Sequence, residues 1–303
     1  TSLDLNPNKL TLVRLSYRHS GRSPDLYVEN TDGFPLGLEE SRRQLEGFRR
    51  FDEAARVRDR AEALVQFSPL DSLAFDATYG TTQDNFHESP YGLLKDISFY
   101  YTFDVDYSPR PEFSLFAEYA REKYRTRQRS RLTCALGVGL CAGENNSPNN
   151  DWESSSRDLV DTWTTGVDVS LAKGRVTFTT FYSLSATSGS IQTWGLGDSS
   201  LPGFLLDSTL TACGFGGCTP QDFPDTNNRL HNVVASIKFP LFKRLSPKLE
   251  YRYEQYDRVD WQTQLMRPYM FGVDPTSATQ IFLGADAPSY GANVLAVTME
   301  YRF

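Results

Sequence analysis

The sequence has no apolar run near the length of a membrane-spanning helix, and its mean hydropathy is −0.45. A helical membrane protein is therefore excluded. The chain also lacks an excess of basic residues: 31 Lys and Arg stand against 38 Asp and Glu, for a net charge of −7. This balance argues against a nucleic-acid partner, whose binding face would be basic. No Cys-x-x-Cys-His motif occurs, so the chain itself attaches no c-type haem.

Histidine is scarce, and this limits both catalysis and metal binding. His19, His87 and His231 are far apart in sequence, with no ligand partner at metal spacing and no serine beside them in a catalytic arrangement. The acidic stretch from Gly143 to Asp151 lacks the regular carboxylate spacing of a Ca²⁺ loop. We therefore expect no enzyme activity, no catalytic residue, no metal site and no cofactor bound by this chain.

The four cysteines form two close pairs in loops rich in Gly and Asn. Local pairs of this kind favour disulfides formed in an oxidising compartment. A four-thiolate metal site is the alternative, but the spacings differ from the two-residue knuckles of zinc sites. We predict the disulfides Cys134–Cys141 and Cys213–Cys218.

The strongest positive feature is the end of the chain. From Leu295 to Phe303 apolar and polar residues alternate strictly, which is typical of a strand with two different faces. A closing strand with outward apolar residues and a terminal aromatic is what outer-membrane β-barrels use. We assign Tyr301 and Phe303 as the assembly signal, and the 13% aromatic content fits strands with interfacial girdles.

Segments with the same alternation recur along the whole chain. We expect ten strands, near residues 10–19, 56–67, 72–83, 95–107, 112–124, 160–171, 175–186, 229–241, 248–258 and 290–303. Short links carrying Pro, Gly or Ser follow every second strand, and long extracellular loops are expected near 20–55, 125–158, 187–227 and 259–288. Short turns at one end and long loops at the other are typical of an outer-membrane barrel.

The predicted fold is therefore all-β, an antiparallel transmembrane barrel in one unit over residues 1–303, integral to the bacterial outer membrane. Ten strands could close alone, since the number is even. However, Leu3 and Leu5 alternate with polar residues before a turn-like Asn6-Pro-Asn-Lys9, as in the tail of a further strand. This remnant predicts a wider barrel of which the chain is a part. The start at Thr1 without Met leads us to expect either a removed leader or a longer polypeptide.

Alternation also predicts which charged residues face the barrel lumen. On the inward positions such side chains either grip a partner or line a water-filled pore and pair across strands. The predicted lumen residues are Arg14, Arg18, Arg60, Glu62, Asp76, Asp104, Asp106, Glu118, Asp168, Arg175, Glu250, Arg252, Glu254, Glu300 and Arg302.

An ordered set of short motifs carries a family resemblance. It comprises Arg56-Val-Arg-Asp-Arg-Ala61, Phe223-Pro-Asp-Thr226, Arg229-Leu-His231, Leu249-Glu-Tyr-Arg-Tyr-Glu254, Asp260-Trp261 and Tyr301-Arg-Phe303. With these the chain resembles the C-terminal part of the MtrB/PioB-type porin-cytochrome barrels. Family barrels are longer, and their amino-terminal half with its Cys-x-x-Cys motif has no counterpart here.

The resemblance implies a barrel that sheathes a multihaem c-type cytochrome and supports electron transfer across the outer membrane. The haem c would be carried by the periplasmic partner, with an extracellular multihaem cytochrome as a further candidate partner and outer-membrane lipid around the barrel. The alternative is a porin that passes small solutes, with the long segment from Ser185 to Asn227 as a loop folded into the lumen.

Overall fold

The computed structural model describes residues 1–23, 48–131, 151–195, 222–242, 244–261, 269–271, 280–282 and 289–301. Every regular element among these residues is a β-strand. The described residues contain no helix with the length and apolar character needed to cross a bilayer.

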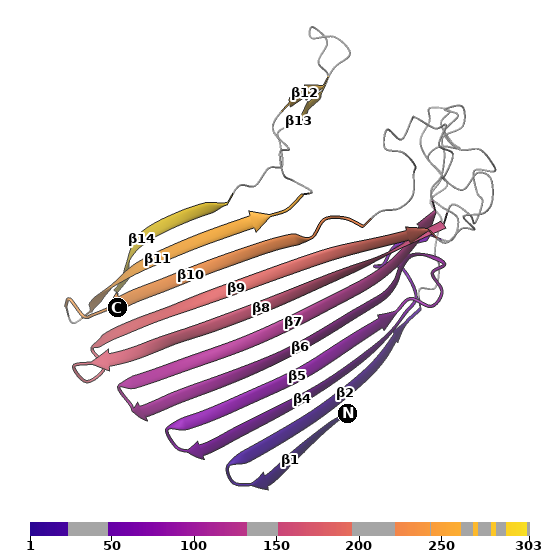
Figure 1. Cartoon of the computed structure of the whole chain (residues 1–303). Coiled ribbons are helices and arrows are strands. Elements are labelled where there is room, and N and C mark those ends of the chain that lie inside the picture. Colours follow the sequence, from indigo (N-terminus) through magenta and orange to yellow (C-terminus); the bar gives the residue numbers. More distant parts are fainter. Residues whose placement is uncertain are drawn as a thin grey trace.

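One large sheet dominates the structure (Figure 1). Its strands follow one another in chain order, and each pairs antiparallel with the next. They are β1 (Ser2–Asn8), β2 (Thr11–Arg22), β4 (Arg56–Leu70), β5 (Leu73–Asn85), β6 (Tyr91–Arg110), β7 (Phe113–Arg131), β8 (Asp151–Leu171), β9 (Val176–Gly195), β10 (Thr226–Lys238), β11 (Leu245–Val259) and β14 (Tyr290–Tyr301).

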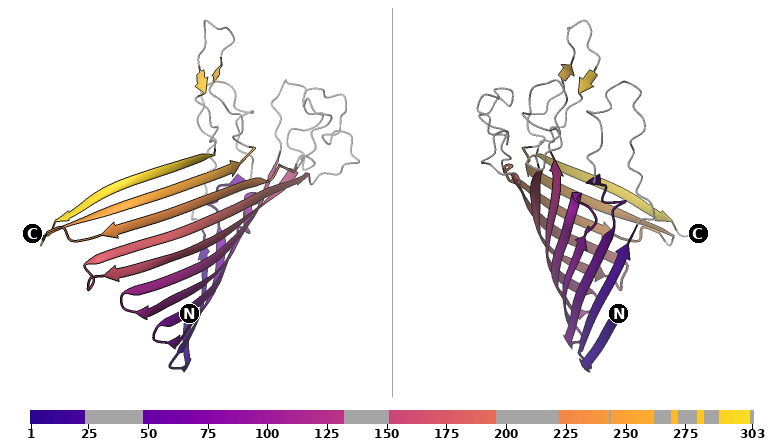
Figure 2. Two further views of the ribbon diagram at one scale, coloured as in Figure 1. Left: turned by 60° about the vertical axis from the view of Figure 1, so that its left-hand side comes forward. Right: turned by 90° about the vertical axis from the view of Figure 1, so that its right-hand side faces the viewer.

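Three short strands lie off this path. β3 (Phe48–Arg49) adds a two-residue parallel pairing to β6. β12 (Tyr269–Phe271) and β13 (Gln280–Phe282) form a separate two-stranded sheet. In the described residues the large sheet is open, with β1 and β14 at its edges, and it twists and curves strongly (Figure 2). This is the geometry of a length of barrel wall.

Tight turns gather at one end of the sheet. The pairs β1–β2, β4–β5, β6–β7 and β8–β9 are joined there, at the lower left of Figure 1. The β8–β9 turn uses left-handed backbone at three consecutive residues, Ala172 (φ 52°), Lys173 (φ 59°) and Gly174 (φ 80°). Only the glycine adopts this conformation without steric cost. The strands therefore reverse sharply on this side, as the sequence predicts.

The strand bounds differ from the predicted ones in two respects. Residues 2–8 form a complete strand and not only a strand tail, so eleven strands follow the main path. The strands β6 to β9 contain 19 to 21 residues each, and they include 125–131, 151–158 and 187–195, which we expected in loops. Charged and polar residues replace apolar ones at the outward positions there, so the apolar–polar alternation disappears while the hydrogen-bonded ladder continues.

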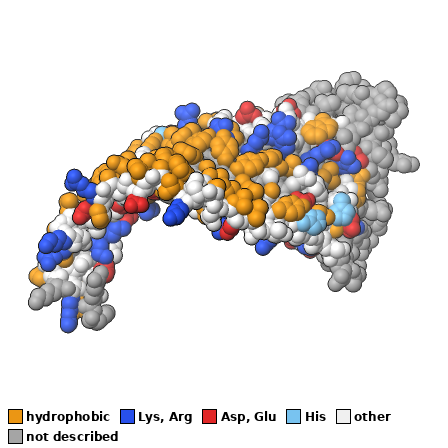
Figure 3. All heavy atoms as spheres, turned by 90° about the horizontal axis from the view of Figure 1, so that it is seen from below, with side chains coloured by type: hydrophobic (Ala, Val, Ile, Leu, Met, Phe, Trp, Pro, Cys, Tyr) orange, Lys and Arg blue, Asp and Glu red, His pale blue; other side chains and the backbone are white. Residues whose placement is uncertain are grey.

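The two faces of the sheet differ as the alternation predicts. Among the described residues only Ala54, Ala55, Phe86 and Val234 are buried apolar residues. Large apolar side chains instead stand exposed on one face, for example Phe103 at 48% and Val297 at 62%. Figure 3 shows apolar side chains gathered over the middle of the visible surface. A sheet with its apolar face outward and no core beneath requires lipid as its solvent.

Aromatic rings form rows on this apolar face. Phe67 stacks on Phe75 at 6.3 Å between ring centroids, near the tight turns. Further along the strands, Tyr119 lies 6.0 Å from Tyr101 and 5.3 Å from Trp163. The second row lies farther from the tight turns than the first, on the outer half of the apolar face.

Candidate functional site: the polar face of the sheet

The polar face carries most of the predicted lumen residues, and the structure divides them by their partners. Near the N-terminal edge, Arg14 makes a two-pronged contact with Asp4 of β1, with Nε–Oδ1 at 2.8 Å and a second nitrogen–Oδ2 distance of 2.9 Å. Arg60 lies 3.0 Å from Glu62, which also accepts a hydrogen bond from the Tyr100 hydroxyl. These charges are satisfied within the wall.

The C-terminal strands are paired in the same way. Glu250 lies 2.7 Å from the Lys248 ammonium and 3.5 Å from the Arg252 guanidinium. Glu300 forms an ion pair with Lys238, and Glu254 accepts a hydrogen bond from the Tyr290 hydroxyl. All of these groups are partly exposed, so such pairs orient side chains more than they stabilise the fold.

The middle of the polar face is different, because it is acidic and unpaired. Asp76 of β5 lies directly opposite Asp104 of β6, and Asp104 lies directly opposite Glu118 of β7. Asp106 follows two residues along β6 on the same face. None of the four forms an ion pair within the described residues. Directly opposed residues on one face place their Cβ atoms about 5 Å apart, so these carboxylates repel one another. We call these four residues the acidic row.

The remaining predicted residues are placed as follows. Asp168 opposes Ser114 and Thr179 on the polar face and likewise has no ion pair among the described residues. Arg18 opposes Arg60, and Arg175 lies exposed in the β8–β9 turn, outside the strands. Arg302, Phe303 and the four cysteines lie outside the described residues, and Tyr301 ends β14.

The histidines have ordinary partners. His19 Nδ1 lies 2.8 Å from Asp59, which also accepts a hydrogen bond from Tyr17. His231 Nδ1 lies 2.9 Å from the Tyr182 hydroxyl. The described ranges contain no group of three or more potential metal-ligating side chains.

Sequence reasoning missed two sets of ion pairs on the long strands β7 and β8, one near their far ends and one at their middle. Glu153 of β8 has 0% of its side chain exposed and is held by Arg127 at 2.5 Å and Arg129 at 2.6 Å. Asp161 forms an ion pair with Arg121 at 2.5 Å and accepts a hydrogen bond from the Tyr119 hydroxyl at 2.7 Å. A signal was present in the sequence, because cations recur at every second residue from Arg121 to Arg131. The contacts of Glu153 hold the far ends of β7 and β8 together.

Taken together, an exposed apolar face, a polar opposite face, aromatic rows and tight turns at one end define a wall of a transmembrane outer-membrane β-barrel. The family model described as "Putative outer membrane beta-barrel porin, MtrB/PioB" matches residues 1–303. The chain belongs to this family and is an integral protein of the outer membrane.

Solved outer-membrane proteins share the fold at low sequence identity. "Copper transporter OprC" superimposes with a TM-score of 0.54 and 6% identity over 96% of this chain and 39% of that one. The siderophore receptor PiuA from Acinetobacter baumannii has a TM-score of 0.49 and 9% identity, over 98% of this chain and 43% of that one. The ferric yersiniabactin uptake receptor FyuA from Yersinia pestis has a TM-score of 0.46 and 8% identity, over 99% of this chain and 40% of that one. The chain thus spans less than half the length of these barrels. A search of curated protein sequences gave no significant match.

Proposed function

We propose that this chain forms part of the wall of a barrel that sheathes a multihaem c-type cytochrome and supports electron transfer across the outer membrane. Family membership motivates the partner, and the acidic row is the observation that carries the proposal on this chain. The haem c belongs to a periplasmic cytochrome inserted in the barrel, and an extracellular multihaem cytochrome is its candidate exit partner.

The division of labour follows from the chemistry. Electrons cross an insulating bilayer by hopping between closely spaced redox centres, and the haems of the partner supply those centres. The barrel wall needs an apolar outside for lipid and a polar inside that orients the partner. The polar face of this sheet offers both self-paired charges and free ones, and only the free ones are available to a partner.

The acidic row has a physical reason to meet a cationic surface. Like charges directly opposed in a sheet destabilise it, and here three carboxylates lie in line across β5, β6 and β7. A basic patch on an inserted protein would relieve this repulsion while fixing the orientation of that protein. Asp104 lies at the centre of the row and is the residue we expect to contribute most.

The same argument assigns a different role to the paired residues. Arg14, Glu62 and Glu250 already have partners within the wall. Their neutralisation would leave another charge of the wall unpaired and disturb the wall itself. We therefore assign contact with the partner to the acidic row, and the maintenance of the wall's own structure to the ion pairs.

The test compares two double variants of the protein expressed from its full gene. Asp104→Asn with Glu118→Gln removes two of the four charges of the acidic row, including the central one. Asp71→Asn with Glu112→Gln is the matched control, because it removes the same charge from exposed turn residues at the same end of the strands. Cytochrome association is measured by co-purification and haem absorption at rising salt.

We expect the row variant to lose cytochrome at lower salt than the control, while its own resistance to denaturant stays equal or rises because the repulsion is gone. Reconstitution into liposomes loaded with a redox dye tests the whole function, with dye reduction expected only when cytochrome is present. Equal solute leakage with and without cytochrome, and no dye reduction in either case, would replace the conduit with a plain porin.

A further inference from the structure

A row of cations occupies the apolar face of β7, where lipid-facing residues are expected. Phe113, Leu115, Ala117 and Tyr119 start this face, and Arg121, Lys123, Arg125, Arg127 and Arg129 continue it at every second residue. Side chains alternate strictly along a strand. The cations therefore stand on the outside of the wall and not in the lumen.

Only part of this charge is balanced by the protein. Arg121 is paired with Asp161, and Arg127 and Arg129 share Glu153. Four further cations on the same face have no ion pair among the described residues. They come from three neighbouring strands, β6, β7 and β8, and we call them the cationic patch: Lys95, Lys123, Arg125 and Arg157.

The strand register brings the patch together. Arg125 lies directly opposite Arg157, and Lys123 lies directly opposite Phe99 and Leu159. Lys95 opposes Arg127. Two arginines facing one another across a ladder are destabilising unless an anion lies between them. An anion bound at this point of the wall would therefore reduce the repulsion between the cations.

The depth of the patch in the membrane follows from strand length. A transmembrane strand needs about ten residues to cross the apolar layer. Counting about that many from Phe113 on β7 reaches Lys123, and from Val169 on β8 it reaches Leu159. Phe113 and Val169 are register partners, as are Lys123 and Leu159, so the two counts mark one level on the wall. The outer edge of the apolar band therefore runs beneath Arg125 and Arg157, at the level of lipid headgroups.

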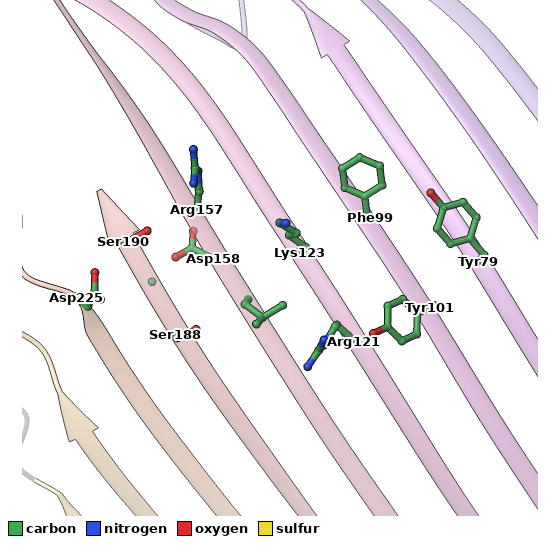
Figure 4. Close-up of a pocket in the computed structure, with 12 residues that line it drawn as sticks. Tyr79, Phe99, Tyr101, Arg121, Lys123, Arg157, Asp158, Ser188, Ser190 and Asp225 are labelled. Atoms are coloured by element: carbon green, nitrogen blue, oxygen red, sulfur yellow. The ribbon is translucent and has the colours of Figure 1, made fainter. Parts of the chain in front are cut away.

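The surface is hollowed at the same place. An open hollow of about 640 Å³ is lined by the aromatic residues Tyr79, Phe99 and Tyr101 and by the cations Arg121, Lys123 and Arg157. Figure 4 shows these side chains on adjacent strands, with Asp158 beside Arg157 and Asp225 at one border. A second hollow of about 340 Å³ continues outward along Lys95, Arg125 and Trp194. Aromatic and cationic side chains in adjacent positions suit a ligand that carries both acyl chains and an anionic head group.

We propose that the cationic patch binds the phosphate groups of lipopolysaccharide in the outer leaflet. The acyl chains would lie along the apolar face of β5 to β8, and the phosphorylated sugars would meet Lys123, Arg125 and Arg157. Arginine and lysine bind phosphate through charge-assisted hydrogen bonds, which are stronger than neutral ones. This lipid contact is on the opposite face from the acidic row and independent of any cytochrome.

The experiment measures binding of lipid A to the purified protein in neutral detergent. The variant Lys123→Gln with Arg125→Gln and Arg157→Gln removes three charges from the patch. The matched control, Lys9→Gln with Arg110→Gln and Lys173→Gln, removes three exposed cations at the tight-turn end. Dephosphorylated lipid A and inorganic phosphate serve as the competing ligands.

We expect the patch variant to bind lipid A about tenfold or more weakly, since several charge-assisted contacts are lost, and the control to bind as the parent does. Binding should weaken with salt, because the contacts are ionic and partly exposed. Equal losses in both variants would overturn the proposal. If the patch variant does not fold, the unsubstituted protein still tests the proposal. Equal affinity of this protein for lipid A and for dephosphorylated lipid A would contradict a lipid site. Full displacement of lipid A by millimolar inorganic phosphate would contradict it as well.

Discussion

Ala117 gives a direct test of which face of the sheet meets lipid. It lies on the apolar face of β7, exposed, opposite Val105 and Thr165. Ala120 lies three residues along the same strand on the polar face, opposite Thr102 and Thr162. Replacing each alanine by arginine adds the same side chain at a similar depth, once toward lipid and once toward the lumen. The pair therefore separates orientation from every other effect of the substitution.

The expected magnitude follows from depth. Strands rise about 3.3 Å per residue and tilt by about 40° in barrels, so Ala117 stands roughly 10 Å above Phe113 along the membrane normal. In an apolar band about 25 Å tall this is close to the midplane, where an arginine on the lipid face costs about 2–4 kcal/mol. The folding equilibrium constant should fall roughly 30- to 900-fold for Ala117→Arg. Ala120→Arg should change little, because its guanidinium reaches a polar lumen that contains the acidic row.

The assay is urea-dependent folding into phospholipid vesicles, followed by tryptophan fluorescence and by the gel mobility of the folded form. Both variants are compared with the parent under identical lipid conditions. Similar destabilisation by the two substitutions would refute the assignment of the faces, and a larger loss for Ala120→Arg would invert it.

Two further predictions concern backbone packing and the cysteines. A Cβ added at Gly166 would lie 2.5 Å from the Phe116 ring, so Gly166→Ala should destabilise the folded state by about 1–3 kcal/mol. A Cβ at Gly291 would meet nothing within 4 Å, so Gly291→Ala should change the stability by no more than about 0.5 kcal/mol. The same urea titration measures both variants. Mass spectrometry of a non-reduced digest should find two local disulfides, each closing a small extracellular loop, and a free thiol or a link between the loops would reject the pairing. The predicted bridges are Cys134–Cys141 and Cys213–Cys218.

The alternation of side chains made the sheet and its two faces predictable. Wherever apolar and polar residues alternate, as in Phe99 to Tyr107 or Leu249 to Tyr253, the predicted strand exists and its faces have the predicted character. The family resemblance is likewise confirmed over the whole chain. This succeeds because a lipid solvent imposes one simple rule on every outward position.

The same rule explains what the sequence did not predict. Above the apolar band the outward positions are no longer selected for hydrophobicity, so Arg125 or Glu153 looks like a loop residue although its backbone remains in the ladder. Partners across strands, such as Glu153 with Arg129, depend on register, and register cannot be read from one strand alone. The acidic row could be predicted as lumen-facing, but its lack of ion pairs could not.

The extension of β6 to β9 beyond the bilayer has a consequence for how the outer rim recognises other molecules. β7 contains 19 residues, about twice the number that a strand needs to cross the bilayer. The buried Glu153 holds the last residues of β7 through its ion pairs with Arg127 and Arg129. Ordering a residue of free backbone costs about 1–2 kcal/mol, a cost that flexible loops meet only when they bind. Here that ordering is complete when the sheet forms. A rim of this kind meets its partner as a preformed rigid template, with little entropy left to lose and amides that exchange slowly with solvent hydrogen.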